Sequence, residues 1–246
     1  PELISEQIVI YVNKPIKYMD DNLLRDQFGI ESYGNRNIDL LLGRLAEAGV
    51  DVIDLREEII GDGLDIYDMF YRTDHHWKTR SGLWAAGKIA AGLNEYCGYD
   101  IDLSLFDESK YIFRNWENCW LGEQGGLVGA SYVGLDDYTE IKPGFETHLS
   151  FKRPEGLQPG CFDDYIDESI YNTELDVYEA FSWHYSYWME DVVNDDVPYG
   201  KMLILGDSYD HVMIPFLSLG VSEVDVLVMR YYWDSVRGYI DAGGYD

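Results

Sequence analysis

Strands alternate with a helix near both ends of the chain, and this alternation constrains the fold most. Residues 6–12 are rich in β-branched and apolar side chains, which predicts a strand. Residues 33–48 place apolar side chains at helical spacing, and Gly49 then provides a common helix stop. Residues 50–55 follow at once as a second short strand. This order is typical of an α/β unit.

The alternation resumes further along the chain. Residues 57–65, which contain two glycines, are expected to be a linker, and residues 79–96 to form a long amphipathic helix. Near the C-terminus, residues 202–205 and 224–229 predict strands. Residues 208–219 between them predict a helix interrupted by Pro215. Both ends of the chain therefore predict the α/β class.

Residues 101–198 differ in character, because aromatics and glycines are frequent there and helical periodicity is weak. We expect an insert of short strands and loops, which forms a lid or substrate wall on a single domain of residues 1–246. The aromatic side chains are expected mainly in the core, with stacking on sugar rings as the alternative role for several of them. They are Trp116, Trp120, Tyr132, Tyr138, Trp183, Tyr185, Tyr187 and Trp188.

The charge balance limits the partners. The chain has 46 acidic and 18 basic residues, a formal net charge of −28. Such a charge keeps the protein soluble and repels phosphate backbones and anionic lipids, so we expect neither nucleic acid nor direct membrane insertion. No apolar run approaches the roughly 20 residues of a membrane span.

The cysteines and the start of the chain indicate little about its chemistry. Cys97, Cys119 and Cys161 lack the Cys-x-x-Cys spacing of zinc or thioredoxin-like sites and allow one disulfide at most. The chain begins at Pro1 without a signal-like segment, so we expect a mature fragment whose leader or anchor is absent.

The run Asp74-His75-His76-Trp77 carries the first candidate chemistry. A carboxylate held close to an imidazole fixes its tautomer and stabilises the imidazolium, which makes the pair a general base. Either histidine could serve on chemical grounds alone. The alternatives are a structural histidine pair and a metal site, but the spacing identifies no further metal ligands.

A nucleophile for this base appears far downstream. The strand at residues 202–205 runs into Gly206-Asp207-Ser208, and a serine at such a turn lies at the carboxyl edge of the sheet, where α/β folds bind ligands. The alternative role of Ser208 is helix N-cap. Arg230 ends the next apolar strand at the same edge, where it would bind a substrate carboxylate or brace the site through a salt bridge.

These residues carry a resemblance to a known family. Tyr71-Arg72-Thr73 followed by Asp74–Trp77, the later Gly206-Asp207-Ser208 and the strand end Arg230-Tyr231-Tyr232 resemble the DHHW proteins. That family is similar to the alginate O-acetyltransferase-like branch of the SGNH hydrolases. The resemblance implies an SGNH-hydrolase-like (flavodoxin-like) three-layer α/β/α core with a mainly parallel sheet.

The resemblance also implies site residues. The relatives carry Asp-x-His-Trp, which assigns Ser208 as nucleophile, His76 as base and Asp74 as its orienter, with His75 at the variable position and Trp77 closing the motif. The Ser208 amide is expected to stabilise an oxyanion, and a glycine block resembling that of the relatives adds Gly126, Gly129 and Ser131 as candidates. No metal and no cofactor are implied.

The expected function is acyl transfer. Ser208 would take an acetyl group from an ester, and water or a sugar hydroxyl would then accept it. The family favours an acetylesterase or O-acetyltransferase that acts on extracytoplasmic polysaccharide, either secreted or at the cell surface. The alternatives are a non-catalytic carbohydrate-binding or scaffold protein and a small-ester carboxylesterase. The sequence does not define the oligomeric state.

Overall fold

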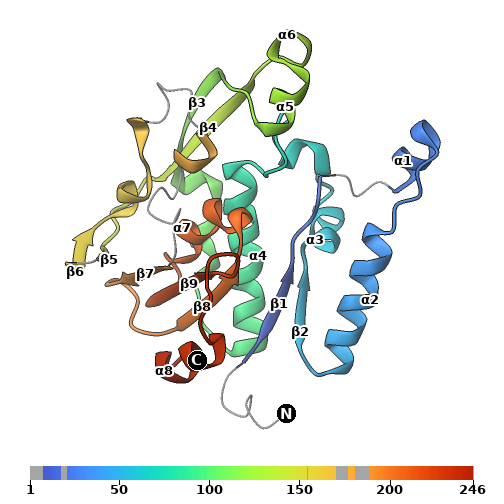
Figure 1. The fold of residues 1–246 in the computed structure, drawn as a ribbon. Coiled ribbons are helices and arrows are strands. Elements are labelled where there is room, and N and C mark those ends of the chain that lie inside the picture. The colour runs from blue at the N-terminus through green and yellow to red at the C-terminus, as the bar shows by residue number, and fades with distance from the viewer. Residues whose placement is uncertain (1–7, 18–20, 154, 170–176, 181–188, 246) are drawn as a thin grey trace.

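The computed structural model describes residues 8–17, 21–153, 155–169, 177–180 and 189–245 (Figure 1). The helices are α1 (Asp21–Phe28), α2 (Gly34–Glu47), α3 (Leu55–Gly61), α4 (Thr79–Cys97), α5 (Glu123–Val128), α6 (Ala130–Val133), α7 (Ile214–Leu217) and α8 (Val236–Gly243). The strands are β1 (Ile10–Asn13), β2 (Asp51–Asp54), β3 (Tyr111–Trp120), β4 (Asp136–Pro143), β5 (Leu149–Arg153), β6 (Gly156–Gly160), β7 (Met189–Asn194), β8 (Lys201–Gly206) and β9 (Glu223–Val228).

The two ends of the chain form the expected α/β units. Helices α2 and α4 confirm the helices predicted from apolar spacing, and β1, β2, β8 and β9 confirm the strands, although residues 6 and 7 lie outside the described ranges. The predicted linker at residues 57–65 is wrong, because most of it belongs to α3. That helix begins with Asp54 as N-cap, whose side chain accepts a hydrogen bond from the Arg56 amide.

The described strands form three sheets, of which the largest is mixed. Strands β1 and β2 pair in parallel, whereas the five-stranded sheet has the order β6-β5-β7-β9-β8. Within it only the β8–β9 pair is parallel, and the other three pairs are antiparallel. The expectation of a mainly parallel sheet is therefore wrong for the described strands. Strands β5 and β6 are joined by a short hairpin, which can connect only antiparallel neighbours.

The region at residues 101–198 is not one outlying insert. Its strands β5 and β7 belong to the sheet that contains β8 and β9. The hairpin β3–β4 forms a separate two-stranded sheet, and α5 and α6 lie at one end of it, at the top of Figure 1.

The aromatic residues of this region divide between core and surface. Trp120 and Tyr138 are buried, whereas Tyr132 in α6 is 84% exposed. Trp116 is partly buried and packs against the core. The predicted core positions Trp183, Tyr185, Tyr187 and Trp188 lie outside the described residues.

Helix α4 joins the first half of the fold to the second. Gly82 in its first turns approaches the 3₁₀-helix η8 (Ser208–Val212) so closely that an added Cβ would lie 2.1 Å from the Val212 carbonyl oxygen. The segment that precedes α4 and the turn that follows β8 are thereby held at one place.

Two further findings concern the whole described chain. No helix within the described ranges combines the length and the apolar character that a bilayer crossing requires. Cys97, Cys119 and Cys161 are all free thiols.

Candidate active site

The Asp74–His76 turn brings a carboxylate and an imidazole into direct contact. The Oδ1 atom of Asp74 accepts a hydrogen bond from the His76 amide at 2.8 Å and lies 2.7 Å from His76 Nδ1. Asp74 is 1% exposed and His76 is 8% exposed. Burial alone would raise the pKa of Asp74, but hydrogen bonds from His76 and from the Glu123 amide outweigh it and lower that pKa to about 2. Asp74 is therefore a carboxylate near neutral pH.

The turn after β8 presents the serine. Asp207 is the N-cap of η8, and its side chain accepts a hydrogen bond from the Tyr209 amide at 3.0 Å. The Asp207 amide in turn donates to Asp210 Oδ2 at 2.9 Å, which completes a capping box. Since Asp207 caps the helix, the alternative role of Ser208 as N-cap is wrong.

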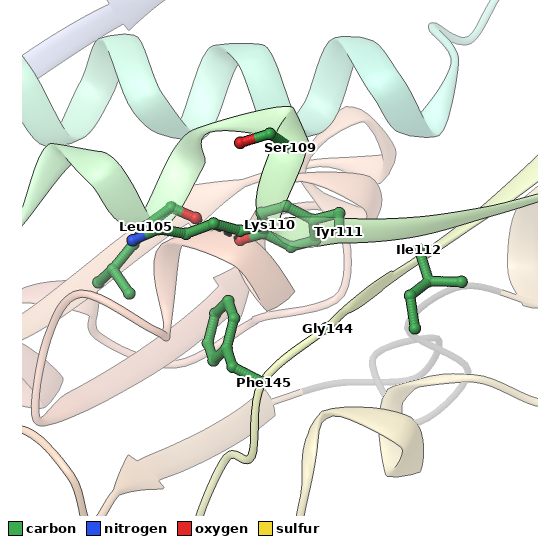
Figure 2. A pocket seen from close by; sticks show the side chains of 7 residues that line it. All are labelled: Leu105, Ser109, Lys110, Tyr111, Ile112, Gly144 and Phe145. Carbon is green, nitrogen blue, oxygen red and sulfur yellow. Dashed lines mark hydrogen bonds between the residues drawn. The ribbon is translucent and has the colours of Figure 1, made fainter.

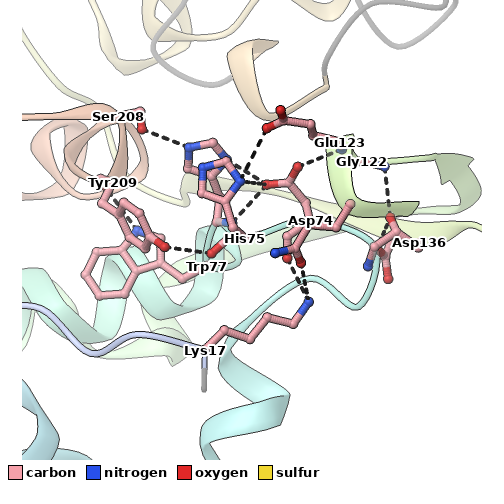
Figure 3. Close-up of polar contacts among 12 residues, drawn as sticks. Lys17, Asp74, His75, Trp77, Gly122, Glu123, Asp136, Ser208 and Tyr209 are labelled. Atoms are coloured by element: carbon pink, nitrogen blue, oxygen red, sulfur yellow. Dashed lines mark hydrogen bonds and ion pairs between the residues drawn. The ribbon is translucent and has the colours of Figure 1, made fainter. Parts of the chain in front are cut away.

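Ser208 instead faces His76. The Oγ atom of Ser208 lies 2.8 Å from His76 Nε2, so Asp74, His76 and Ser208 form one continuous hydrogen-bonded chain (Figure 3). With the His76 Nδ1–H donating to Asp74, Nε2 accepts the hydroxyl proton of Ser208. This is the arrangement in which an imidazole removes a proton from a serine nucleophile.

Two side chains fasten the histidine segment to the serine turn. Trp77 is fully buried, and its Nε1–H donates to the Tyr209 carbonyl at 2.7 Å. The Tyr209 hydroxyl donates back to the His75 carbonyl, also at 2.7 Å. Because both bonds join segments 132 or more residues apart, they fix the distance between His76 and Ser208.

His75 lies beside the triad rather than within it. Its ring centroid is 3.9 Å from that of His76, and its Nδ1 is 3.6 Å from Asp74 Oδ1. Its side chain is 40% exposed. The structure thus distinguishes the two histidines, since His76 rather than His75 contacts both Asp74 and Ser208 at hydrogen-bonding distance.

The same cluster offers three potential metal ligands. One ligand atom each from Asp74, His75 and His76 lies within 4.8 Å of the others. However, His76 Nδ1 is engaged by Asp74 and Nε2 by Ser208. A metal ion here would have to displace one of the two hydrogen bonds that make the triad.

The start of helix α5 contacts Thr73 and Asp74 through backbone amides. The Gly122 amide donates to Thr73 Oγ1 at 2.9 Å, and the Glu123 amide donates to Asp74 Oδ2 at 3.0 Å. The Gly125 amide donates to the Thr73 carbonyl at 2.7 Å. A Cβ at Gly122 would lie 2.4 Å from the Cβ of Asp74, so this close approach requires glycine.

The oxyanion candidates from the glycine block do not fit this geometry. The amides of Gly126 and Gly129 donate to the Gly122 and Gly125 carbonyls at 2.9 and 2.8 Å, and are therefore engaged at the α5 helix. Ser131 lies exposed in α6. The contacts to Thr73 and Asp74 come instead from the amides of Gly122, Glu123 and Gly125.

Arg230 lies two residues beyond β9 and is exposed. Burial raises the pKa of Asp207, but Lys14, the Tyr209 amide and the positive charge of Arg230 outweigh it and lower that pKa. No ion pair joins Arg230 to another residue of the described ranges. Its position thus favours electrostatic support of the capping aspartate over a fixed salt bridge.

A cavity of about 540 Å³ lies elsewhere in the fold (Figure 2). None of the triad residues lines it, and we assign it no part in the reaction. Its lining residues are Leu105, Ser109, Lys110, Tyr111, Ile112, Gly144 and Phe145.

Comparisons with known proteins concern the Asp74–Trp77 motif and the fold. The family model described as "SGNH hydrolase-like domain, acetyltransferase AlgX" matches residues 19–104, which include the Asp74–Trp77 motif. The fold is that of an SGNH hydrolase-like domain. The expected resemblance to this branch is confirmed. No curated protein sequence matches the chain.

Solved structures share the fold along almost the whole chain. PatB1 from Bacillus cereus is 18% identical, covers 96% of this chain and 78% of its own, and has a TM-score of 0.72. A second PatB1 structure, with a sulfonyl adduct, is 19% identical over 95% of this chain and 77% of its own, with a TM-score of 0.70. A DHHW family protein from Eubacterium siraeum is 16% identical over 100% of this chain and 77% of its own, with a TM-score of 0.66.

Proposed function

We propose that this protein is a serine-dependent O-acetyltransferase or acetylesterase that acts on an extracytoplasmic polysaccharide. The observation that carries the proposal is the 2.8 Å contact between Ser208 Oγ and His76 Nε2, in a chain that continues to the carboxylate of Asp74. The family model supports it, because its description joins an SGNH hydrolase-like domain to acetyl transfer. A purely binding or scaffold protein would need no such contact.

The reaction follows from the roles of these three residues. His76 removes the Ser208 proton as the hydroxyl oxygen attacks the carbonyl carbon of an acetyl ester. The tetrahedral intermediate collapses to an acetyl-serine, and the protonated His76 returns its proton to the departing alcohol. Asp74 stabilises the imidazolium throughout. The acetyl group then passes to water or to a sugar hydroxyl, which His76 deprotonates in its turn.

The surroundings suggest where the substrate lies. We assign the Ser208 amide as one oxyanion donor, because Ser208 is the first residue of η8 and backbone N–H groups at a helix N-terminus stabilise anions. The hairpin β3–β4 with α5 and α6 forms the substrate wall in this proposal, since the start of α5 contacts Asp74. The exposed Tyr132 offers a ring for stacking on a sugar.

A competition experiment tests the choice of acceptor. The protein is incubated with p-nitrophenyl acetate, with and without an oligosaccharide, and with Ser208→Ala as control. An acetyltransferase gives acetylated oligosaccharide at the expense of free acetate, whereas an acetylesterase gives acetate alone. Acetylated sugar formed equally by Ser208→Ala would contradict the proposal. A protein that hydrolyses small esters, is not inhibited by acetylated glycans and does not deacetylate them would instead be a carboxylesterase.

A further inference from the structure

Two buried charges flank the backbone that carries Asp74, and the mechanism above uses neither of them. Lys17, in the segment after β1, is 9% exposed, and Asp136, at the start of β4, is 8% exposed. Burying an ion costs free energy unless hydrogen bonds and an opposite charge offset the loss of water. Both ions bond to the backbone of residues 72–74, so the interactions there must offset the cost of burying them.

Lys17 holds the carbonyl groups of this backbone. Its Nζ donates to the carbonyl oxygens of Arg72 and Asp74, each at 2.8 Å, and to Gln124 Oε1 at 3.2 Å (Figure 3). An ammonium group has three donors, and these acceptors match that number. Burial lowers the pKa of Lys17, while the charges of Asp136 and Asp74 act in the opposite direction.

Asp136 holds the amide groups of the same backbone. Its Oδ1 accepts from the Arg72 amide at 3.1 Å, and its Oδ2 accepts from the Thr73 amide at 2.7 Å and from Thr73 Oγ1 at 2.6 Å. The amides of Arg72 and Thr73 thus face an anion, and the carbonyls of Arg72 and Asp74 face a cation. The two side chains come from segments that are distant in sequence and converge on the three residues that end in Asp74.

We propose that Lys17 and Asp136 are paired positioning residues that hold the backbone of residues 72–74 and balance its charge, so that Asp74 stays in contact with His76. This inference rests on the proposed function, because it concerns how the acid of the triad is presented. The two charges are opposite, so their removal has opposite electrostatic effects. Loss of Lys17 removes a positive charge beside the backbone that carries Asp74, and loss of Asp136 removes a negative one.

The pH dependence of acylation separates this role from a merely structural one. In Lys17→Met the midpoint of the acid limb of the pH–rate profile rises, and in Asp136→Asn it falls, each by on the order of half a pH unit. The maximal rate falls in both, by about tenfold or more, because Asp74 is held less well. The double variant loses one charge of each sign and returns the midpoint close to that of the wild type.

Conservative and remote variants serve as controls. Lys17→Arg keeps the charge and therefore keeps the midpoint. Lys201 is the first residue of β8, at the end of the strand far from Ser208, and pairs with Glu223. Its replacement in Lys201→Met leaves both the midpoint and the rate unchanged. Thermal unfolding establishes which variants are folded. Lower rates in Lys17→Met and Asp136→Asn without opposite shifts of the midpoint would overturn the proposal.

A spectroscopic measurement keeps this test independent of catalysis. The His76 Nδ1 proton, held in the 2.7 Å contact with Asp74, is expected as a downfield proton resonance. It moves upfield and exchanges faster with water in Lys17→Met and Asp136→Asn, but not in Lys201→Met. If the resonance changes in this way but the protein is never acylated, the positioning role is upheld and the proposed function fails. A resonance unaltered in both charge variants would refute the positioning role.

Discussion

Replacing Gly82 by alanine tests how closely α4 must approach the serine turn. The added Cβ would lie 2.1 Å from the Val212 carbonyl oxygen, about 1.3 Å short of the 3.4 Å at which ordinary contact begins. The position of the Cβ is fixed by the backbone of α4, and the carbonyl group belongs to the backbone of η8, so no side-chain rotation relieves the clash and α4 and η8 must separate. His76 precedes α4 and Ser208 begins η8, so this separation lengthens the 2.8 Å contact between them.

Two opposing effects set the magnitude. Overpacking costs about 1–3 kcal/mol, and alanine in a helix recovers roughly 0.5–1 kcal/mol relative to glycine. The net loss of about 1–2 kcal/mol corresponds to a Tm lower by about 2–8 °C for a chain of this size. Acylation by p-nitrophenyl acetate falls further, by about a hundredfold, since a displacement of about 1 Å at reacting groups has that effect.

Gly43→Ala is the matched control. Gly43 lies inside α2 with nothing within 4 Å of an added Cβ, so the same substitution stabilises the protein by about 0.5–1 kcal/mol and leaves acylation unchanged. Thermal unfolding and the rate of acylation are measured for both variants. A Gly82→Ala protein with wild-type stability and rate would refute the argument that this contact positions the triad.

Three further substitutions give distinct results. Asp74→Asn keeps the shape of the side chain but loses the charge that stabilises the imidazolium, so acylation falls about ten-thousand-fold; a fall below tenfold would contradict the role of Asp74. Tyr209→Phe removes the bond to the His75 carbonyl and lowers the free energy of unfolding by about 0.5–1.5 kcal/mol, measured in urea; an unchanged value would show that this bond adds no stability. Burial raises the pKa of Asp210 from 3.8 to about 6, so the stability that its protonation gives is full below pH 3.8 and is lost as the pH rises through 6. Asp210→Asn therefore becomes more stable relative to wild type between pH 4 and pH 8, by about 1–3 kcal/mol, and a difference independent of pH would contradict this account.

The parts of the site that the sequence predicts are those encoded locally. Asp74 and His76 are two residues apart, so a single turn brings them together, and their pattern is visible in the chain. Ser208 was predicted because a strand that ends in Gly-Asp-Ser places a hydroxyl at the sheet edge. Helices α2 and α4 were predicted because their apolar faces repeat over several turns.

The parts that it misses depend on contacts between distant segments. Lys17 and Asp136 reach the backbone of residues 72–74 across 55 or more residues, and no local pattern marks either of them. Asp207 and Ser208 are both good N-caps, so only the geometry shows that the aspartate caps the helix and frees the serine. Pairing direction is likewise set by which strands become neighbours, which explains why the antiparallel strands β5 and β7 were not foreseen.

The amides of the glycine block likewise depend on structure that the sequence does not encode locally. Sequence likeness placed Gly126 and Gly129 among the oxyanion candidates, yet their amides are engaged at α5. A few positions earlier, the Glu123 amide donates to Asp74 and the Gly122 amide donates to the neighbouring Thr73. A difference of a few residues decides which amides are free of the helix and can bond to the Thr73–Asp74 segment. That difference depends on the residue at which α5 begins.

The most direct test of the central claim is the intact mass of the protein after incubation with p-nitrophenyl acetate, measured for wild type and Ser208→Ala. The account predicts one added acetyl group in the wild type, located at Ser208 by peptide mapping and absent from the variant. An acetyl group on another residue, or equal labelling of Ser208→Ala, would contradict the assignment of Ser208 as the nucleophile.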